Sequence, residues 1–281
     1  MTNLFSGLEE FGFDNISNLN IYEDKKEKVD KKVTKEKEEV KIYEEDFIFD
    51  KTFKCPSCDT EFKSKFIKTG RVKLLSLDTD LRPRYQDVDS LKYDVVVCPS
   101  CGYAAITRYF TYLTRTQIKL VREQITSSFR GIKNDESTIS YDDAIIRHKL
   151  ALVSAIVKKG KTSERAYTCL KLAWLLRGKR ETLPENTPDY KDEVKVLEKE
   201  ETAFIMNAYQ GFKQAFAMEP FPMSGMDEIT VTLLVAELAR RTGNNSEAAR
   251  WISKILISRE ANDRIKDRAR EIKDLLVDNK E

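Results

Sequence analysis

Histidine is almost absent from this 281-residue sequence, and its scarcity limits the chemistry open to the chain. With His148 alone, histidine-based catalytic triads and histidine-rich metal centres have little to work with. The motifs G-x-S-x-G, G-x-x-x-x-G-K-[ST] and G-x-G-x-x-G are missing too, which removes the common hydrolase, P-loop and dinucleotide-binding interpretations. We interpret His148, within an Arg-His-Lys stretch of a helix, as a surface residue.

Long apolar runs are also lacking. The first residues show no basic start followed by an apolar run, which argues against a secretory signal. No stretch approaches the ~18–20 apolar residues that a membrane-spanning helix needs. The net charge is only +2, so a global basic footprint for nucleic acid is absent. We therefore expect a soluble, cytoplasmic protein without membrane contact.

Charged residues make up 34% of the chain and are concentrated in residues 23–46, with 8 lysines and 10 acidic residues. Such a segment cannot offset its ordering entropy, so we expect a disordered linker; the alternative is a lone, marginal helix. An apolar patch precedes it. This patch is either a docking peptide or a terminus that folds back or stays poorly ordered. Its members are Phe5, Leu8, Phe11, Phe13, Ile16, Leu19 and Ile21.

Residues 47–113 are predicted to form a β-rich module. Thr69-Gly70-Arg71 supplies a turn, and residues 93–97 form a short run rich in valine. This module contains four of the five cysteines, in two C-x-x-C pairs. In a reducing compartment, such pairs are typical of metal ligands rather than disulfides.

The two cysteine pairs have the same form, Cys55-Pro-Ser-Cys58 and Cys98-Pro-Ser-Cys101. Gly102 follows the second pair and allows the left-handed backbone that a thiolate-wrapping turn often needs. The 39 residues between the pairs can hold an inserted hairpin and loop. Because zinc prefers tetrahedral sulfur ligands, and four thiolates close the site, we predict one structural Zn²⁺ per chain.

Spacing alone leaves an iron or iron–sulfur centre open. A thioredoxin-like redox pair is disfavoured because it would need only one C-x-x-C motif. The fifth cysteine, Cys169, lies on a helix rich in leucine and alanine, and we interpret it as a small core residue.

Basic residues near the cysteines have two interpretations. They either offset the negative charge of a tetrathiolate zinc or, interleaved with aromatic residues, form a nucleic-acid-binding face. These residues are Lys54, Lys63, Lys65, Lys68, Arg71 and Lys73, with Phe62, Phe66 and Tyr85. Further along, Asp78 and Asp80 could bind a second metal or act as acid and base, although turn formation is the commoner role of Asp-Thr-Asp.

Residues 114–281 are predicted to be helical. Thr114 with Gln117 and Ser140 with Asp143 have the form of N-terminal capping boxes. The expected helices after the first cover about 141–159, 163–177, 190–218, 227–242, 246–258 and 261–278. Gly178 is expected to end the second of these. The turn at residues 243–248 resembles the centre of a tetratricopeptide repeat, which would give a concave face for peptides. The alternative is any antiparallel helical bundle.

Several segments together resemble a bacterial family called domain of unknown function 2225. The likeness runs from about Lys54 to the C-terminus and rests on five segments: CPSC, LLSLDTDLRPRY, LKYDVVVCPSCGYAA, FPMSGMDE and ELARRTGNNSEAARW. It implies a cysteine-ligated metal site and a repeat-like helical half. It implies no biochemical activity.

The sequence as a whole predicts an α+β protein. Residues 1–46 are the apolar patch and charged disordered linker, 47–113 a small zinc-ribbon-like β module, and 114–281 an all-α tetratricopeptide-like domain. We interpret the protein as a non-enzymatic, zinc-stabilised adaptor or scaffold that binds a protein or peptide. The alternatives are a nucleic-acid-associated zinc-ribbon protein and an enzyme using the Asp78/Asp80 loop.

Overall fold

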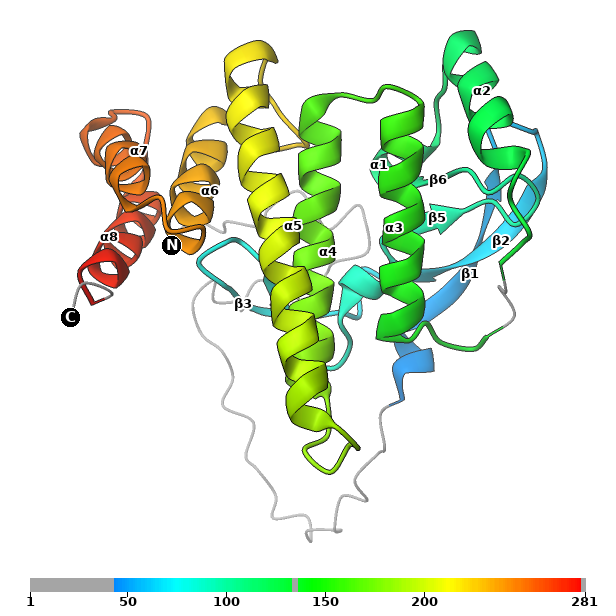
Figure 1. The fold of residues 1–281 in the computed structure, drawn as a ribbon, viewed down its shortest axis with the longest axis horizontal. Helices are drawn as coiled ribbons and strands as arrows, with labels where there is room; N and C mark the ends of the chain where they lie inside the picture. Colours follow the sequence, from blue (N-terminus) through cyan, green and yellow to red (C-terminus); the bar gives the residue numbers. More distant parts are fainter. Residues whose placement is uncertain (1–42, 133–135, 279–281) are drawn as a thin grey trace, which may run out of the picture. The chain divides into compact units, whose positions relative to one another are not determined.

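The structure is a computed structural model, which describes residues 43–132 and 136–278 (Figure 1). The apolar N-terminal patch and nearly all of the charged linker lie outside the described residues. Residues 42–281 form one compact unit. Within the described part of the chain, no helix is both long and apolar enough to cross a bilayer.

The β-rich part consists of three separate antiparallel hairpins. The first and last hairpins each lead into a cysteine pair, and the middle one lies in the segment between the pairs, where the sequence predicted an insertion. The pairs are β1 (Ile48–Lys54) with β2 (Glu61–Ile67), β3 (Leu74–Leu77) with β4 (Pro83–Tyr85), and β5 (Val95–Val97) with β6 (Ala104–Ile106).

Helices dominate the rest of the described chain, so the predicted order of a β-rich part followed by a helical part is confirmed. The side chains of Thr114 and Ser140 accept hydrogen bonds at the starts of α2 and α3, as their capping patterns predicted. The α-helices are α1 (Thr107–Phe110), α2 (Arg115–Val121), α3 (Tyr141–Val157), α4 (Thr162–Thr182), α5 (Tyr190–Met218), α6 (Glu228–Arg241), α7 (Asn245–Ile257) and α8 (Asp263–Asp278). Short 3-10 turns η2 (Glu44–Phe47) and η3 (Ser90–Tyr93) and a π-helical turn η4 (Arg122–Thr126) complete the described elements.

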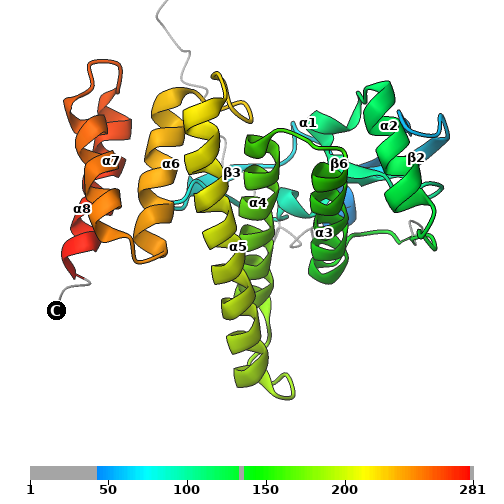
Figure 2. The same ribbon diagram turned by 45° about the horizontal axis from the view of Figure 1, so that its top comes forward.

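Helix α4 is central to the row formed by α3, α4, α5 and α6, which both ribbon views show side by side (Figures 1 and 2). Nearly every residue between Thr168 and Gly178 is buried, including the charged Lys171 and Arg177. A helix that is buried on all sides belongs to the core rather than to the surface. Helix α4 therefore lies at the centre of the helical core.

The predicted end of this helix at Gly178 is wrong, because α4 continues to Thr182. Gly178 serves packing instead of termination. A Cβ atom at this position would lie 2.6 Å from the Tyr141 ring and 2.9 Å from Arg82 Nη2. Glycine therefore lets two side chains approach the helix backbone, at a modest cost in helix propensity.

The β5–β6 hairpin is buried on both faces. Val95 and Val97 lie in one apolar cluster with Ala151 of α3, whereas Val96 belongs to another cluster that includes the cysteines. Neighbouring side chains of a strand point to opposite faces, so three valines cover both sides. At its edge, the backbone N–H of Ala104 donates to Ser154 Oγ in α3 over 3.1 Å.

The contacts of the β5–β6 hairpin with α3 join segments on either side of residue 113, where we predicted a division between the β module and the helical domain. Helix α3 packs on β5 and β6. The predicted domain boundaries as such stay a prediction.

The prediction that His148 lies on the surface is wrong, since the residue is fully buried. Its Nδ1 atom lies 2.8 Å from the carbonyl oxygen of Ala144. Burial lowers the pKa of the imidazole to about 4, although the nearby charge of Asp94 opposes this shift; Lys171 adds to it. The charged residues on either side of His148 in sequence concealed this burial.

This burial predicts a specific pH dependence of stability. Between the folded-state pKa of about 4 and the unfolded-state value of about 6.5, the unfolded chain binds a proton that the folded protein does not. The free energy of unfolding should therefore fall by about 2 kcal/mol from this group alone as the pH drops from 7 to 5. Denaturant unfolding at both pH values tests this.

The matched variant is His148→Gln, because the chain has no second histidine. Both proteins keep the same cysteines, so any acid effect on a bound metal is common to them. The variant should lose less stability than the parent between pH 7 and 5. Equal losses in both proteins would contradict the assignment.

Candidate metal centre

Each cysteine pair lies in the turn of a hairpin, and the two turns have the same hydrogen bonds. In the first, the Cys55 N–H donates to Thr60 O and the Asp59 N–H donates to Cys55 O, both over 2.9 Å. In the second, Cys98 N–H donates to Tyr103 O over 2.9 Å, and Gly102 N–H donates to Cys98 O over 3.0 Å. The sequence similarity of the pairs therefore reflects equal local structure.

Equivalent positions of the two turns also share a left-handed backbone. The φ angle is 61° at Asp59 and 76° at Gly102. At the second position a Cβ atom would lie 2.5 Å from the Phe129 ring, so both φ and packing favour glycine there. The first position uses aspartate, which tolerates this conformation better than most residues.

The four sulfur atoms meet at one point. Sγ of Cys55 lies 3.6 Å from Sγ of Cys101, and Sγ of Cys58 lies 3.6 Å from Sγ of Cys98. All four lie within 4.8 Å of one another. Tetrahedral ligands at a Zn–S distance of about 2.3 Å are about 3.8 Å apart, so the spacing is compatible with zinc.

No histidine or carboxylate among the described residues joins this group of four. Cys55, Cys98 and Cys101 are buried, and Cys58 is half-buried. The structure thus brings the predicted cysteines together in an arrangement that can hold a metal ion. Their role as ligands stays a prediction.

The thiols influence each other strongly. Hydrogen bonds with Cys101 and Cys55 lower the pKa of Cys98 below its ordinary value, whereas hydrogen bonds with Cys101 and Cys98 raise the pKa of Cys55. Full ionisation of four sulfurs in this space requires a cation, which is the charge that a bound divalent metal supplies.

A small aromatic core supports the two turns. Phe53 of β1 and Phe62 of β2 stack with centroids 6.2 Å apart, and both contact the Phe110 ring edge-on. Tyr103 stacks on Phe110 at 5.2 Å. These rings and the cysteines belong to one buried cluster, so the two cysteine turns share one core with the hairpins.

Two residues that follow the β module each donate a hydrogen bond to one of the cysteine turns. Arg122 Nη2 donates to the carbonyl oxygen of Ser57 over 2.9 Å, and Thr126 Oγ1 donates to that of Cys101 over 3.0 Å. Both residues come from the π-helical turn η4, a type of irregularity that is frequent at functional sites. Sequence reasoning missed them, because neither residue type marks a contact to a distant turn.

Three of the five lysines near the cysteines have carboxylate or backbone partners. Lys54 pairs with Asp59 at 3.4 Å, and Lys65 pairs with Asp50 at 2.9 Å. Lys68 donates to a backbone carbonyl over 3.1 Å. Cys169 is buried within the helical core, as the sequence predicted.

The other sequence candidates, Asp78 and Asp80, lie in the β3–β4 loop and face arginines. Arg177 Nη2 lies 2.5 Å and Arg241 Nη1 2.6 Å from Oδ2 of the fully buried Asp80. Arg84 donates two hydrogen bonds, 2.7 and 2.8 Å, to Asp78. Glu201 of α5 accepts from Arg177 and Arg241, which closes the ion network.

The arginine contacts of Asp78 favour its ionised form. Burial raises the pKa of Asp78, but hydrogen bonding and charge from Arg84 outweigh it and leave the pKa below its ordinary value. A carboxylate in this environment is a poor proton donor. The arrangement therefore gives Asp78 and Asp80 a structural role and does not favour acid–base chemistry.

Two segments named for the family resemblance meet in this network. Thr79 Oγ1 donates to Glu237 over 2.7 Å, and Asp80 pairs with Arg241. The first residues belong to LLSLDTDLRPRY and the second to ELARRTGNNSEAARW, which are far apart in sequence. The sequence offered no sign that Arg177 and Glu201 would join them.

Metal analysis tests the cysteine site. The purified protein should contain about one zinc ion per chain, and Cys98→Ser should remove it because three thiolates no longer close the tetrahedron. Cys169→Ser is the matched control and should keep the metal, since Cys169 lies apart from the four. Elemental analysis that finds below ~0.2 zinc per wild-type chain, and no iron, would reject the site.

Denaturant unfolding tests the ion network. Asp80→Asn should lower the free energy of unfolding by about 3–5 kcal/mol, because two guanidiniums each lose one buried counter-charge. Asp267→Asn, which removes an exposed ion pair with Arg270, should change it by no more than about 0.5 kcal/mol. A loss at Asp80 no larger than at Asp267 would contradict the importance of the network.

Comparison with known proteins identifies the family of the chain. No curated protein and no solved structure matches the chain. One family does, over residues 48–276, and its description is an uncharacterised protein conserved in bacteria (DUF2225). The match covers most of the chain, including both cysteine pairs and the helices. The chain therefore belongs to the bacterial domain of unknown function 2225 family.

Proposed function

We propose that this chain is a non-enzymatic adaptor, in which a structural zinc ion stabilises the β module and the helices bind a partner protein. The four sulfurs support zinc because their spacing suits a tetrahedral ion and leaves no position for a substrate. In this proposal the protein acts in the reducing cytoplasm, where free thiols persist as ligands.

The observation that carries the adaptor proposal is a groove of 360 Å³ between α3, α4 and α5. Leu152 and Ile156 of α3 form one wall, and Phe204 of α5 belongs to the other. Ile156 is 53% exposed, so its apolar side chain is open to solvent in the groove. The groove offers apolar surface for a partner to cover.

The floor and rim of the groove suggest the partner's chemistry. Gly211 of α5 approaches Ala166 of α4 so closely that a Cβ there would lie 2.8 Å from the alanine Cβ. Arg165 and two glutamines, Gln210 and Gln214, supply polar groups at the rim. We infer a partner helix with an apolar stripe, flanked by a carboxylate that pairs with Arg165.

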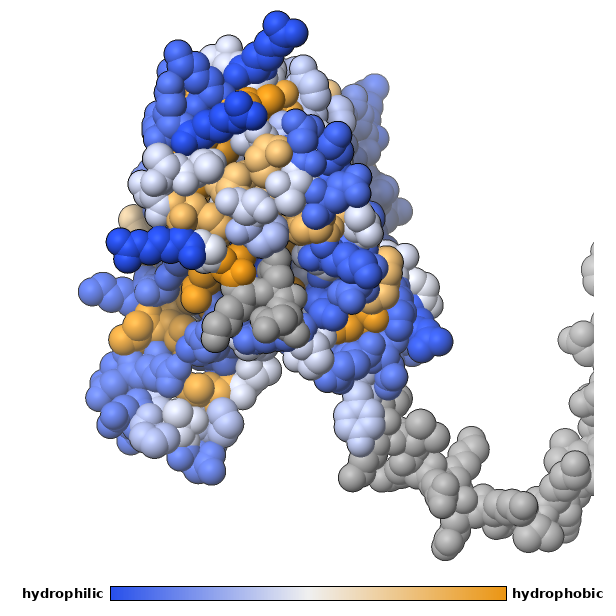
Figure 3. Space-filling model, turned by 90° about the vertical axis from the view of Figure 1, so that its right-hand side faces the viewer, coloured by the Kyte–Doolittle hydropathy of each residue, from blue (hydrophilic) through white to orange (hydrophobic). Residues whose placement is uncertain are grey.

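The nucleic-acid alternative would use the face that carries β1, β2 and α2. On this face apolar side chains lie between hydrophilic ones (Figure 3). Two of its candidate lysines, Lys54 and Lys65, already pair with carboxylates. Such ion pairs reduce the charge available to phosphates, so the adaptor proposal is preferred.

Photo-crosslinking in bacterial cells tests the adaptor proposal. A photoreactive amino acid at Ile156 should capture a defined protein, whereas the same group at Ile257, which is 82% exposed on α7, should not. The captured protein is then purified and its affinity measured. Ile156→Glu should weaken binding at least about tenfold, which corresponds to ~1.4 kcal/mol, because it places a charge in an apolar contact.

Ile257→Glu is the matched control and should leave the affinity within about twofold. Circular dichroism and thermal melting of both variants must show an intact fold. Equal capture at the two positions, or equal affinities of the two variants, would contradict the groove as the binding surface.

A further inference from the structure

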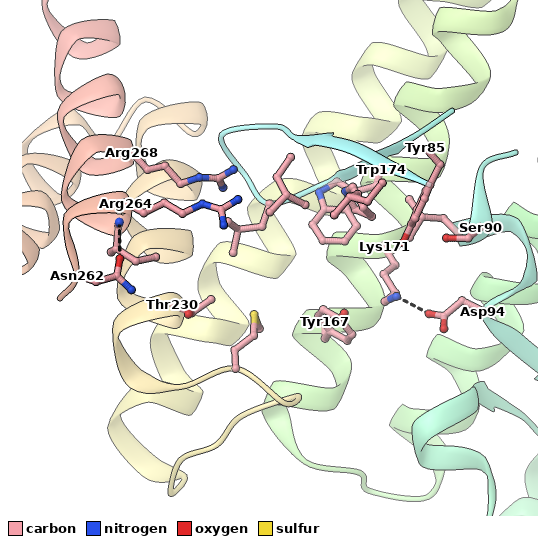
Figure 4. A pocket seen from close by; sticks show the side chains of 17 residues that line it. Tyr85, Ser90, Asp94, Tyr167, Lys171, Trp174, Thr230, Asn262, Arg264 and Arg268 are labelled. Atoms are coloured by element: carbon pink, nitrogen blue, oxygen red, sulfur yellow. Dashed lines mark hydrogen bonds and ion pairs between the residues drawn. The ribbon is translucent and has the colours of Figure 1, made fainter. Parts of the chain in front are cut away.

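A second cavity lies on the other side of α4, with a volume of 630 Å³. Side chains from the β3–β4 hairpin, α4 and α8 line it (Figure 4). In α4 these are Tyr167, Lys171 and Trp174, whereas the groove uses Thr162, Ala166 and Cys169. At 3.6 residues per turn, the two sets occupy opposite faces of the helix, so this cavity is separate from the proposed partner groove.

The walls of the cavity are apolar and aromatic. Tyr85, Tyr167 and Trp174 contribute rings, and leucines of β3 and its loop add aliphatic surface. Cavities of a few hundred cubic ångströms with such walls are typical of small-molecule sites. The aromatic faces suit a flat, aromatic ligand body.

One end of the cavity carries uncompensated positive charge. Arg264 and Arg268 extend from α8 toward Trp174 (Figure 4), and their i, i+4 spacing puts them on the same helix face. Among residues 43–132 and 136–278, neither guanidinium has an ion-pair or hydrogen-bond partner. In contrast, Arg177 and Arg84 each pair with two carboxylates or more.

Helix α8 also begins at this end of the cavity. Asn262, Arg264 and Ile265 line it, so the first turn of a 16-residue helix lies beside the two guanidiniums. The first-turn N–H of Ile265 already donates to Asn262 Oδ1 over 3.0 Å, and Asp263 lies in the same turn, so the positive potential at this end comes from the guanidiniums. Two guanidiniums match a dianionic group such as phosphate better than a single carboxylate does.

A buried donor lies between the charged end and the opposite wall. Trp174 is only 4% exposed, and its Nε1–H has no hydrogen-bond partner among the described residues. A buried N–H group without a partner costs free energy unless a ligand or water accepts a hydrogen bond from it. At the far wall, the buried Lys171 pairs with Asp94, so its charge is already compensated.

We propose that this cavity binds a small aromatic phosphate, such as a nucleoside monophosphate. The phosphate binds Arg264 and Arg268, the aromatic body lies against the cavity rings, and an acceptor atom of the ligand receives the Trp174 Nε1–H bond. The site is independent of the partner groove, so it can be present whether or not the adaptor proposal holds.

Isothermal titration calorimetry on the full-length, zinc-loaded protein tests this proposal. The probes are adenosine, guanosine, cytidine and uridine monophosphates, phenyl phosphate, adenosine and inorganic phosphate. At least one aromatic phosphate should bind more than about tenfold tighter than adenosine or inorganic phosphate, because only it uses both halves of the cavity. Its affinity should also weaken as salt is raised.

Variants distinguish binding in this cavity from non-specific attraction of phosphate to positive charge. Arg264→Gln with Arg268→Gln should weaken binding at least about tenfold. Arg270→Gln is the matched control, since Arg270 lies on the same helix but pairs with Asp267, and it should have no effect. Trp174→Phe, which keeps an aromatic ring and removes the donor, should weaken binding several-fold.

Three results would overturn the proposal. They are the absence of binding by every aromatic phosphate at millimolar concentration, equal binding of inorganic phosphate, and an equal loss in Arg270→Gln. Thermal melting of each variant, with and without the tightest probe, adds a second measurement. The probe should raise the melting temperature of the parent and of Arg270→Gln but not that of the double arginine variant.

Discussion

The buried carboxylate of Asp80 is the contact on which the docking of the β3–β4 loop on the helices depends. It belongs to the insertion between the two cysteine pairs, yet its partners Arg177 and Arg241 lie in α4 and α6. A fully buried charge is costly unless it is paired, so this loop is stable only when docked on the helices. Glu201 of α5 joins the same arginines, so three helices meet at one charged centre.

The cysteine cluster and the ion network constrain the same stretch of chain, the first at its ends and the second at its middle. Residues 59–97 begin and end at the cysteine turns, and the middle of this stretch is fixed at Asp80. The turns are further tied to η4 by Arg122 and Thr126. A metal ion at the sulfurs would therefore stabilise more than the small module, because the loop that it closes contains the helix-docking contacts.

Local patterns in the sequence predicted much of this structure. The two C-P-S-C segments predicted matching turns, and capping residues such as Thr114 and Ser140 marked helix starts, because these signals depend on neighbours along the chain. Tertiary packing overrode the predictions for Gly178 and His148. Glycine often marks the end of a helix, but Gly178 lies inside α4 because Tyr141 packs against the helix backbone there. Charged neighbours in sequence suggested that His148 is exposed, but tertiary packing buries it.

For the candidate sites too, local patterns could be predicted from the sequence and tertiary contacts could not. The cysteines were predictable because their chemistry and spacing are specific, and Cys169 was correctly separated from them. The partners of Asp78 and Asp80 were not predictable, since an arginine in the middle of a helix carries no sign of which loop it will meet. Arg264 and Arg268 were missed for the same reason, because their lack of partners is visible only when the surrounding chain is in place.

Helix α4 contributes residues to the proposed partner groove, to the cavity and to the ion network. One of its faces lines the proposed partner groove, the opposite face lines the cavity, and Arg177 near its C-terminal end enters the ion network. A ligand in the cavity can affect the groove only if α4 shifts. The ion pairs of the buried cations Lys171 and Arg177 with Asp94 and Asp80 oppose such a shift, because moving either cation would break its pair. The geometry thus favours independent binding at the two proposed sites, on a rigid shared wall.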